Sequence, residues 1–333
     1  MSFPILAVVS RERFYEAKPL LPPDLDLWHW DDWSSTERAK PRGFRGVLGV
    51  GAPLPAAVLL APELEILQLV SAGYEKVDMT AVERGGFTLC NNPGMNAAAV
   101  AEHILMSFLY FARRMGECQR ALYEGDYQDN RARLMGPLLR DLREMTVGLV
   151  GFGSIGRRVA ERVRPFGSPI LYYNRTRRPE DEARYGLRYR ELDDLLREAD
   201  AIAVMLPLNE RTRGLFDARR FALMKSSAIF VNVGRGAVVD QQALAEALVQ
   251  ERLYAASIDV YDPEPVTPDN PLVCVPQSVR DRLLLSPHIA GVTHRTWHDM
   301  VQRALDNLAS YARGEEPHHV IVRGHKLRAE APL

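Results

Sequence analysis

Three glycines, Gly151, Gly153 and Gly156, stand between an apolar run and an amphipathic run, with the spacing of a loop that binds a pyrophosphate. In such a loop the first glycine permits a tight turn, the second lets the anion approach the backbone, and the third lets the helix pack closely on the strand. The anion then lies at the helix N-terminus, here beside Ser154 and Ile155. Glycine-rich turns also occur where nothing binds, so the pattern alone is weak evidence for a dinucleotide site.

The next apolar run after this loop is followed directly by Asn174, Arg175, Thr176 and Arg178. When this kind of site binds NAD, an acidic residue about 20 positions after the glycines accepts hydrogen bonds from the ribose 2′-hydroxyl. No acid stands here, whereas an arginine and a threonine can bind a 2′-phosphate through charge-assisted and hydroxyl hydrogen bonds. The segment therefore favours NADP(H), with NAD(H) possible. The alternative is a solvated run of arginines.

The composition excludes several classes of protein. The chain has 333 residues, 47% of them hydrophobic, and a formal net charge of -1, which predicts two globular domains and no global attraction to nucleic acid or anionic membranes. Cys90, Cys118 and Cys274 are odd in number and widely spaced, which argues against disulfides and a metal site and for buried thiols in a reducing compartment. The short apolar run Ile5 to Val9 has no basic leader, and no run is long enough to span a membrane. We expect a soluble cytoplasmic protein.

The elements that must position the glycine loop are short apolar strands alternating with helices, which is an α/β pattern. Before the loop, strands are expected at 5–9, 47–50 and 66–70. From the loop onward, six strands of a doubly wound parallel sheet are expected at 147–150, 170–173, 201–206, 228–233, 255–260 and 283–285. Asp217 and Asp240 are plausible N-caps of helices between them. The helix after the glycines should bury a face that includes Phe166 and end at Gly167.

Three further segments carry residues that could be either functional or structural. Trp28, Trp30 and Trp33 could form a ligand wall, but a packed cluster is favoured. The apolar helix expected at 97–115 contains Glu102 and His103; adjacent helix residues do not face one another, so separate structural roles are favoured. The charged segment 116–144 is expected to be loop-like.

Several motifs in fixed order resemble the D-isomer-specific 2-hydroxyacid dehydrogenase family. They are GFGSIG at 151–156, LPLNERTRG at 206–214, NVGRGAVVD at 232–240, DVYDPEP at 259–265 and SPHIAG at 286–291, preceded by SAGYEKVD at 71–78 and NNPGMNAAAVAEH at 91–103. The similarity covers most of the chain, from Ile66 to Trp297.

The resemblance implies a discontinuous architecture. Residues 1–96 and 291–333 would form a smaller flavodoxin-like α/β substrate-binding domain, and residues 97–290 a Rossmann domain that binds NAD(P), with the active site in the cleft. It also implies a homodimer built on the coenzyme domains, to which the long helix after Asn96 would contribute.

The resemblance also assigns the chemistry of the site. Reduction of a 2-oxo acid needs a hydride donor, a cation for the carboxylate and carbonyl oxygens, and a proton donor that works near neutral pH. Arg235 would hold the substrate through its planar fork, His288 would be the acid or base, and Glu264 would hydrogen-bond His288 and favour its imidazolium form. Without the motif order, these would read as a surface arginine, a structural histidine and a turn glutamate.

Other residues are assigned by the same resemblance. Asp259 would contact the nicotinamide side, with a capping role as the alternative. The backbone amides of Ala72 and Gly73 would bind the substrate carboxylate, and Tyr74 and Met95 would line the pocket. Trp297 could close the pocket or simply pack. The remaining coenzyme contacts would come from Leu206, Pro207, Thr212, Val233 and Gly234.

The leading interpretation is an NADPH-dependent reductase of glyoxylate, hydroxypyruvate or a larger 2-ketoacid that yields the D-2-hydroxy acid. The alternative is a nucleotide-sensing corepressor-like binding protein of the same fold. Neither the substrate nor the direction of flux follows from the sequence.

Overall fold

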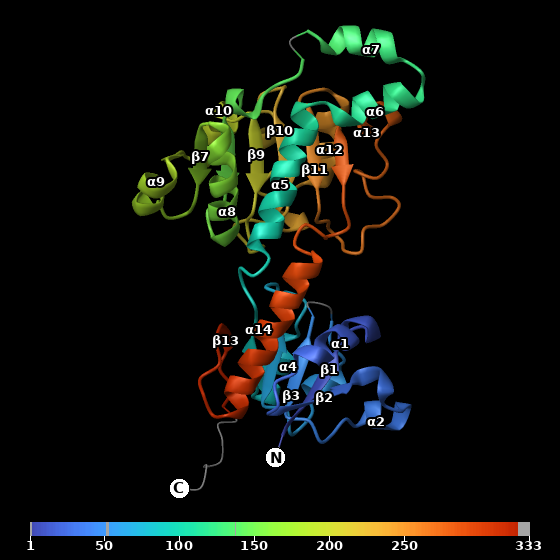
Figure 1. The fold of residues 1–333 in the computed structure, drawn as a ribbon, viewed down its shortest axis with the longest axis vertical. Coiled ribbons are helices and arrows are strands. Elements are labelled where there is room, and N and C mark those ends of the chain that lie inside the picture. Colours follow the sequence, from blue (N-terminus) through green and yellow to red (C-terminus); the bar gives the residue numbers. More distant parts are fainter. Residues whose placement is uncertain (1, 51–52, 137, 326–333) are drawn as a thin grey trace. The chain divides into compact units, whose positions relative to one another are not determined.

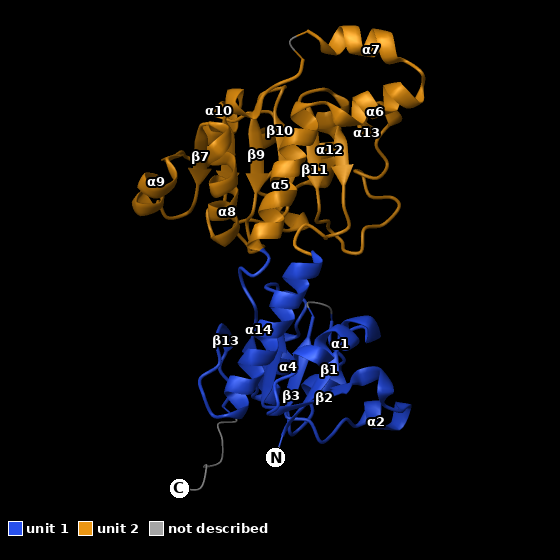
Figure 2. Ribbon diagram, in the orientation of Figure 1, with its two compact units in different colours: residues 1–96, 293–333 blue, residues 97–292 orange. Residues whose placement is uncertain are grey.

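The chain folds into two compact units in a computed structural model that describes residues 2–50, 53–136 and 138–325 (Figures 1 and 2). Unit 1 comprises residues 1–96 and 293–333, and unit 2 comprises residues 97–292. The chain therefore returns to unit 1 after residue 292, where the sequence placed the return after residue 290. Residues 326–333, which the sequence assigned to the substrate-binding domain, lie outside the described part.

Unit 1 contains a six-stranded sheet in the order β13-β5-β4-β3-β1-β2. Strands β1 to β5 pair in parallel, in a flavodoxin-like order, and β13 pairs antiparallel with β5 at the edge. The strands are β1 Phe3–Val8, β2 Leu25–His29, β3 Gly46–Gly49, β4 Ile66–Leu69, β5 Thr88–Cys90 and β13 Val320–Val322. The sequence predicted β1, β3 and β4; it missed the other three, which are short or lie at the sheet edges.

Two apolar clusters lie in unit 1. One includes residues of β1 and of helices α1 (Arg11–Ala17) and α14 (His294–Ala312). The other includes residues of α3 (Ala56–Leu59) and α4 (Met79–Gly85). The rings of Trp28, Trp30 and Trp33 pack beside the second cluster. The centroid of the Trp33 ring lies 6.2 Å from that of Trp28 and 6.0 Å from that of Trp30, which confirms the predicted packing role.

Helix α14 runs antiparallel to the strands of unit 1. The side chain of Asn92, just after β5, donates a 2.8 Å hydrogen bond to the carbonyl of Met300, and two turns later Asn307 donates to Gln68 within β4 at 2.6 Å. The helix therefore begins at the carboxyl edge of the sheet, which places Trp297 at that edge.

Unit 2 contains a seven-stranded parallel sheet in the order β12-β11-β10-β9-β6-β7-β8, which is the doubly wound Rossmann order with one added strand. The order reverses between β6 and β9, where such sheets bind their ligands. The strands are β6 Val147–Val150, β7 Ile170–Tyr173, β8 Leu187–Tyr189, β9 Ala201–Val204, β10 Ile229–Asn232, β11 Ala255–Ile258 and β12 Leu283–Leu285. All six predicted strands are present, and β8 was missed because it is short and exposed at Arg188.

Helices cover both faces of this sheet. One apolar cluster includes residues of α5 (Ala97–Ala112) and α8 (Ser154–Val163). The other includes residues of α10 (Leu192–Glu198), α11 (Ala218–Phe221) and α12 (Gln241–Val249). Asp217 and Asp240 cap α11 and α12 as predicted, each accepting a hydrogen bond from a backbone N–H. Helix α8 ends at Val163 and continues as a 3₁₀ turn, Arg164–Phe166, whose left-handed C-cap is Gly167, so the predicted stop is confirmed. The predicted burial of Phe166 was wrong, because this residue is 41% exposed.

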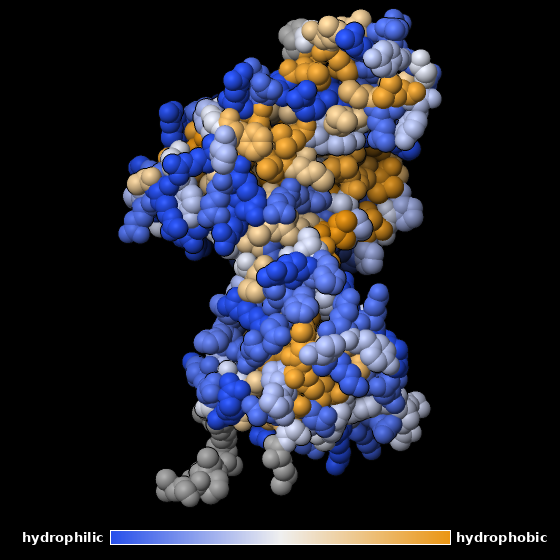
Figure 3. Space-filling view, in the orientation of Figure 1, coloured by the Kyte–Doolittle hydropathy of each residue, from blue (hydrophilic) through white to orange (hydrophobic). Residues whose placement is uncertain are grey.

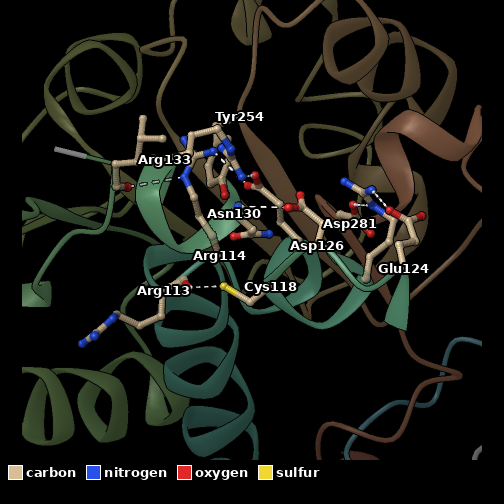
Figure 4. A network of polar contacts seen from close by, with 12 residues as sticks. Arg113, Arg114, Cys118, Glu124, Asp126, Asn130, Arg133, Tyr254 and Asp281 are labelled. Atoms are coloured by element: carbon tan, nitrogen blue, oxygen red, sulfur yellow. Dashed lines mark hydrogen bonds and ion pairs between the residues drawn. The ribbon is translucent and has the colours of Figure 1, made fainter. Parts of the chain in front are cut away.

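The segment expected to be a charged loop is instead helical, with α6 at Met115–Tyr123 and α7 at Tyr127–Leu134. Its charged side chains form ion pairs within the segment and with Asp281: Arg114 contacts Glu117, and Arg120 contacts both Glu124 and Asp281 (Figure 4). Asp126 accepts a hydrogen bond from the backbone of Asn130. Two short helices complete the unit, α9 at Pro179–Tyr185 and α13 at Gln277–Arg280. Unit 1 has one more, α2 at Ser35–Ala39.

The three cysteines are free thiols with different environments. Cys90 is buried, and burial raises the pKa of its thiol to about 12. Cys118 is half-buried and Cys274 is exposed, so the expectation of three buried thiols was wrong for these two. In the described part of the chain, no helix is both long and apolar enough to cross a membrane.

Candidate functional site

The glycine loop has the shape that a pyrophosphate needs. Gly151 has a positive φ of 96°, and a Cβ at Gly156 would lie 3.0 Å from the carbonyl oxygen of Gly151. A Cβ at Gly153 would meet nothing within 4 Å, so the second glycine borders open space. Helix α8 begins at Ser154 without a side-chain cap, which leaves its first amides for a ligand. The three glycines therefore fit turn, approach and close packing.

Asn174 holds this loop in place. Its side-chain oxygen accepts a 2.7 Å hydrogen bond from the N–H of Phe152, and its side-chain nitrogen donates to the carbonyl of the same residue at 3.1 Å. The oxygen and the nitrogen of the Asn174 side chain are thus both hydrogen-bonded to the backbone of Phe152, which lies between the first two glycines. The residue at the end of β7 shapes the loop rather than offering a free side chain.

The arginines that follow differ in what they contact. Arg177 forms two hydrogen bonds with Glu182, at 2.7 and 2.8 Å, and this pairing lowers the pKa of Glu182 to about 2. The guanidinium of Arg178 lies 3.9 Å from Asp181. Arg175 and Thr176 are exposed, and the side chain of Arg175 makes no hydrogen bond or ion pair with the residues the structure describes. Arg175 is therefore the most available cation beside the glycine loop.

The loop after β9 closes against this site. A Cβ at Gly234 would lie 2.7 Å from the carbonyl oxygen of Leu206, and one at Gly151 would lie 3.1 Å from the side chain of Leu206. The hydroxyl of Thr212 donates to the carbonyl of Pro207 at 2.7 Å, so it braces the loop. Val233 is buried at the end of β10. The loops after β6, β9 and β10 thus touch one another, with Leu206 between two glycines.

Glu264 and His288 are in direct contact. The His288 Nδ1 lies 2.9 and 3.1 Å from the two carboxylate oxygens of Glu264. Glu264 also accepts a 3.0 Å hydrogen bond from the N–H of Tyr261. The His288 side chain remains 49% exposed, and its backbone is left-handed, with φ of 57°. With Nδ1 donating to the carboxylate, Nε2 is left for a ligand.

Arg235 lies on the loop after β10, next to the strand that leads to Glu264. Its guanidinium donates to the carbonyl of Gly234 at 2.7 Å. The side chain of Asn232 accepts a hydrogen bond from the N–H of Gly234 and donates one to the carbonyl of Arg235. These two bonds fix the backbone around the arginine. The three residues assigned to catalysis therefore follow adjacent parallel strands, β10, β11 and β12, at their carboxyl ends.

Asp259 holds the loop that carries His288. Its carboxylate is buried and accepts hydrogen bonds from the hydroxyl of Ser286 at 2.6 Å and from the N–H groups of Ile289 and Ala290, both at 2.9 Å. These donors stand on both sides of His288. The contacts of Asp259 are thus those of a loop anchor, which is close to the capping role that the sequence gave as the alternative to the nicotinamide side.

Gly236 is a structural requirement that the sequence did not single out. A Cβ there would lie 2.0 Å from the carbonyl carbon and oxygen of Tyr261. Tyr261 in turn donates its hydroxyl to the carbonyl of Ser286 at 3.0 Å, and burial raises its pKa to about 12. The only available signal was the place of this glycine in the motif after β10.

The residues assigned to substrate binding lie in unit 1, on loops after β4 and β5. The carbonyl of Ala72 accepts from the side chain of Asn91 at 2.6 Å, and the carbonyl of Gly73 accepts from the hydroxyl of Ser71 at 3.0 Å. Tyr74 is exposed at 37%. The Met95 sulfur accepts from Arg303 at 2.9 Å. Among the described residues, no cluster of three or more histidine, cysteine or acidic side chains could hold a metal ion.

Comparison with known proteins decides the family. The model of the D-isomer specific 2-hydroxyacid dehydrogenase NAD binding domain matches residues 105–290. The chain belongs to this family. It is therefore an NAD(P)-dependent D-2-hydroxyacid dehydrogenase with a Rossmann coenzyme domain.

Relatives agree over nearly the whole chain. The glyoxylate reductase of Aeropyrum pernix is 35% identical over 329 residues, which are 95% of each protein. The glyoxylate/hydroxypyruvate reductase B of Klebsiella pneumoniae subsp. pneumoniae is 39% identical over 81% of this chain and 82% of its own. The structure of the D-lactate dehydrogenase of Lactobacillus jensenii with NAD⁺ has a TM-score of 0.80 at 27% identity, covering 96% of this chain and 100% of that one. These relatives are named as enzymes, which gives no support to the corepressor alternative.

Replacing Gly236 with alanine should damage stability and activity together. The added Cβ would overlap the backbone of Tyr261. The backbone after β11, which holds Glu264 through the N–H of Tyr261, must then move. By analogy with overpacked cores, this should lower the free energy of unfolding by about 1–3 kcal/mol. Gly136→Ala is the control, because among the described residues a Cβ there would meet only the carbonyl oxygen of Arg133, at 3.4 Å. Thermal unfolding and kcat measure the two effects; an unchanged Tm for Gly236→Ala would contradict the close approach.

Proposed function

We propose that this enzyme reduces a 2-oxo acid to the D-2-hydroxy acid with NADPH, with glyoxylate, hydroxypyruvate or a larger 2-ketoacid as substrate. The contact between Glu264 and His288, beside the loop of Arg235, is the observation that carries the proposal. The names of the relatives support the substrate class.

In this proposal, residues of unit 2 supply the cation and the proton donor that the reduction requires. The bound nicotinamide supplies the hydride that adds to the substrate C2. Arg235 binds the carboxylate and the carbonyl oxygen, where negative charge develops, through two parallel N–H donors. His288, as imidazolium, gives its Nε2 proton to that oxygen and becomes neutral imidazole, which recovers a proton from solvent. Glu264 accepts from Nδ1 in both states and so keeps the ring oriented.

The loops of unit 1 supply the remaining substrate contacts in this proposal. The amides of Ala72 and Gly73 bind the substrate carboxylate, and Tyr74 and Met95 line the pocket. The carbonyls of Ala72 and Gly73 accept hydrogen bonds from the side chains of Asn91 and Ser71, and these bonds fix the conformation of the turn.

His288→Gln should lower kcat by about 10²-fold or more, because glutamine cannot donate a labile proton to the forming alkoxide. The measurement is NADPH oxidation with a panel of 2-oxo acids. His298→Gln, at an exposed position outside the proposed site, should leave kcat unchanged. Negligible turnover of every acid by the unmodified enzyme would instead favour a binding protein.

The preference for NADPH rests on the charge next to the glycine loop. Arg177 is engaged with Glu182, while Arg175 and Thr176 are exposed. In this proposal Arg175 and Thr176 bind the 2′-phosphate with Arg178 close by, and NAD(H) binds without that contact.

Arg175→Ala should raise the KM for NADPH about 10-fold or more and leave the KM for NADH nearly unchanged, because a charge-assisted hydrogen bond to a remote phosphate is lost. Steady-state kinetics with both coenzymes measure this. The control is Arg188→Ala, an exposed arginine on β8. A higher kcat/KM with NADH than with NADPH in the unmodified enzyme would refute the preference.

We also propose a homodimer in which a second copy covers helices α5, α6 and α7. Figure 3 shows hydrophobic surface beside these helices. The exposed large apolar side chains of this region are Met106, Met115, Leu122, Tyr123, Tyr127 and Met135. A groove of about 280 Å³ lies between α6 and α7 and is lined by Leu122, Tyr127 and Met135. Exposed apolar surface of this kind marks interaction sites.

Leu122→Glu should shift the protein from dimer to monomer, because a charge would be buried in the contact. Sedimentation velocity measures the shift from twice the 37.5 kDa mass of one chain to that mass. Leu60→Glu introduces the same charge at an exposed leucine of unit 1 and should have no effect. A monomeric unmodified enzyme would contradict the dimer.

We also propose a reducing, cytoplasmic compartment, which the free cysteines support.

A further inference from the structure

Arg13 is stacked on Trp297 in unit 1. The guanidinium carbon lies 4.3 Å from the centroid of the indole ring, and helices α1 and α14, which carry the two residues, are in contact. Trp297 is 9% exposed, and its indole nitrogen is buried without a hydrogen-bond partner in the described chain. Arg13 also donates to Glu16 at 2.8 Å. The Arg13 side chain is 34% exposed, and its guanidinium lies over the indole ring.

This pair lies at the edge of the sheet where α/β proteins bind ligands. Strand β1 ends at Val8 and α1 begins at Arg11, so the first turn of α1 is at the carboxyl edge. Trp297 is at the same edge, because α14 runs antiparallel to the strands. The loops after β4 and β5, with Ala72 and Met95, also leave the sheet there, and ligands of open α/β sheets bind outside the carboxyl ends of the strands.

Met95 connects this pair to the proposed substrate contacts. It packs against the apolar cluster that contains Trp297. Met95, which is assigned to the substrate pocket, thus packs on the same apolar cluster as the indole, and Arg13 lies over the face of the indole ring.

The chemistry of Arg13 selects oxygen atoms. A guanidinium only donates hydrogen bonds, and Glu16 uses one side of it, so the remaining N–H groups can bind hydroxyl or carboxylate oxygens. Stacking on an aromatic ring fixes the plane of the group and lowers the entropy lost on binding. An apolar chain in the same place would remove water from the cation and offer no acceptor.

We propose that Arg13, stacked on Trp297, determines substrate specificity by binding the distal end of the 2-oxo acid. The enzyme prefers acids whose chain carries a hydroxyl or carboxylate oxygen beyond C3 to apolar acids of the same shape. This inference rests on the proposed 2-oxo acid reduction and names its substrate class.

The test compares kcat/KM for two matched pairs of acids. One pair, 2-oxoglutarate and 5-methyl-2-oxohexanoate, exchanges a carboxylate for an isopropyl group. The other, 4-hydroxy-2-oxobutyrate and 2-oxopentanoate, exchanges a hydroxyl for a methyl group. We expect the oxygen-bearing acid of at least one pair to be preferred about 10-fold or more, the scale of a hydrogen bond to a charged group, and the pair that shows it identifies the acceptor.

Arg13→Met keeps an unbranched apolar stem but removes the guanidinium, so it should abolish this preference while changing glyoxylate turnover little, because glyoxylate has no distal chain. Arg11→Met is the matched control: Arg11 is exposed on the same helix and pairs with Asp32, so the preference should persist. Trp297→Phe keeps an aromatic face and should retain most of the preference, whereas Trp297→Leu should reduce it.

Three results would overturn the inference. They are equal kcat/KM within both pairs for the unmodified enzyme, a preference that persists in Arg13→Met, and an equal loss of preference in Arg13→Met and Arg11→Met. Glyoxylate turnover separates this failure from failure of the proposed function. If no acid is turned over, calorimetric binding of the same pairs to the enzyme with NADPH still decides whether Arg13 discriminates between them.

Discussion

The buried carboxylate of Asp259 is the constraint on which the arrangement of unit 2 depends. A charge in the interior is costly unless donors surround it, and here one hydroxyl and two backbone N–H groups do so. All three donors belong to the loop around His288, so satisfying the charge also fixes that loop. The left-handed backbone of His288 is a conformation that a free chain would rarely adopt, and the anchored residues on either side hold it.

The end of strand β11 thus organises two loops at once. Asp259 holds the segment after β12, while the N–H of Tyr261 holds Glu264. Gly236, on the loop after β10, lies directly against the backbone of Tyr261, so this third loop also packs against the end of β11. Precise placement of an acid and its partner is what a dehydrogenase must build into its scaffold, because proton transfer requires hydrogen-bonding distance. Parallel strands that end side by side meet this need with short connections.

The sequence predicted the strands that are buried on both faces, because continuous apolar runs such as Val147–Val150 have few other interpretations. It missed Leu187–Tyr189 and Val320–Val322, which are three residues long and lie at sheet edges. Helices α6 and α7 were missed because their sequence is charged, and one of the contacts of α6, that of Arg120 with Asp281, joins residues far apart in the chain. The motif order singled out Glu264 and His288, which the structure brings into contact. It could not indicate the anchoring by Asp259, because two of its three donors are backbone amides, which leave no trace in side-chain identity.

The engagement of Asn174 has a consequence for redesign of the coenzyme site. An acidic residue at the end of the second strand is the usual means of favouring NAD, and position 174 is the obvious place to introduce it. Here the side-chain nitrogen of Asn174 donates to the Phe152 carbonyl, and aspartate would set an anionic oxygen against that carbonyl. Such a change would loosen the pyrophosphate loop before it altered ribose recognition. The side chain of Arg175, the neighbouring exposed position, makes no hydrogen bond with the described part of the chain, so a substitution there would leave the geometry of this loop intact.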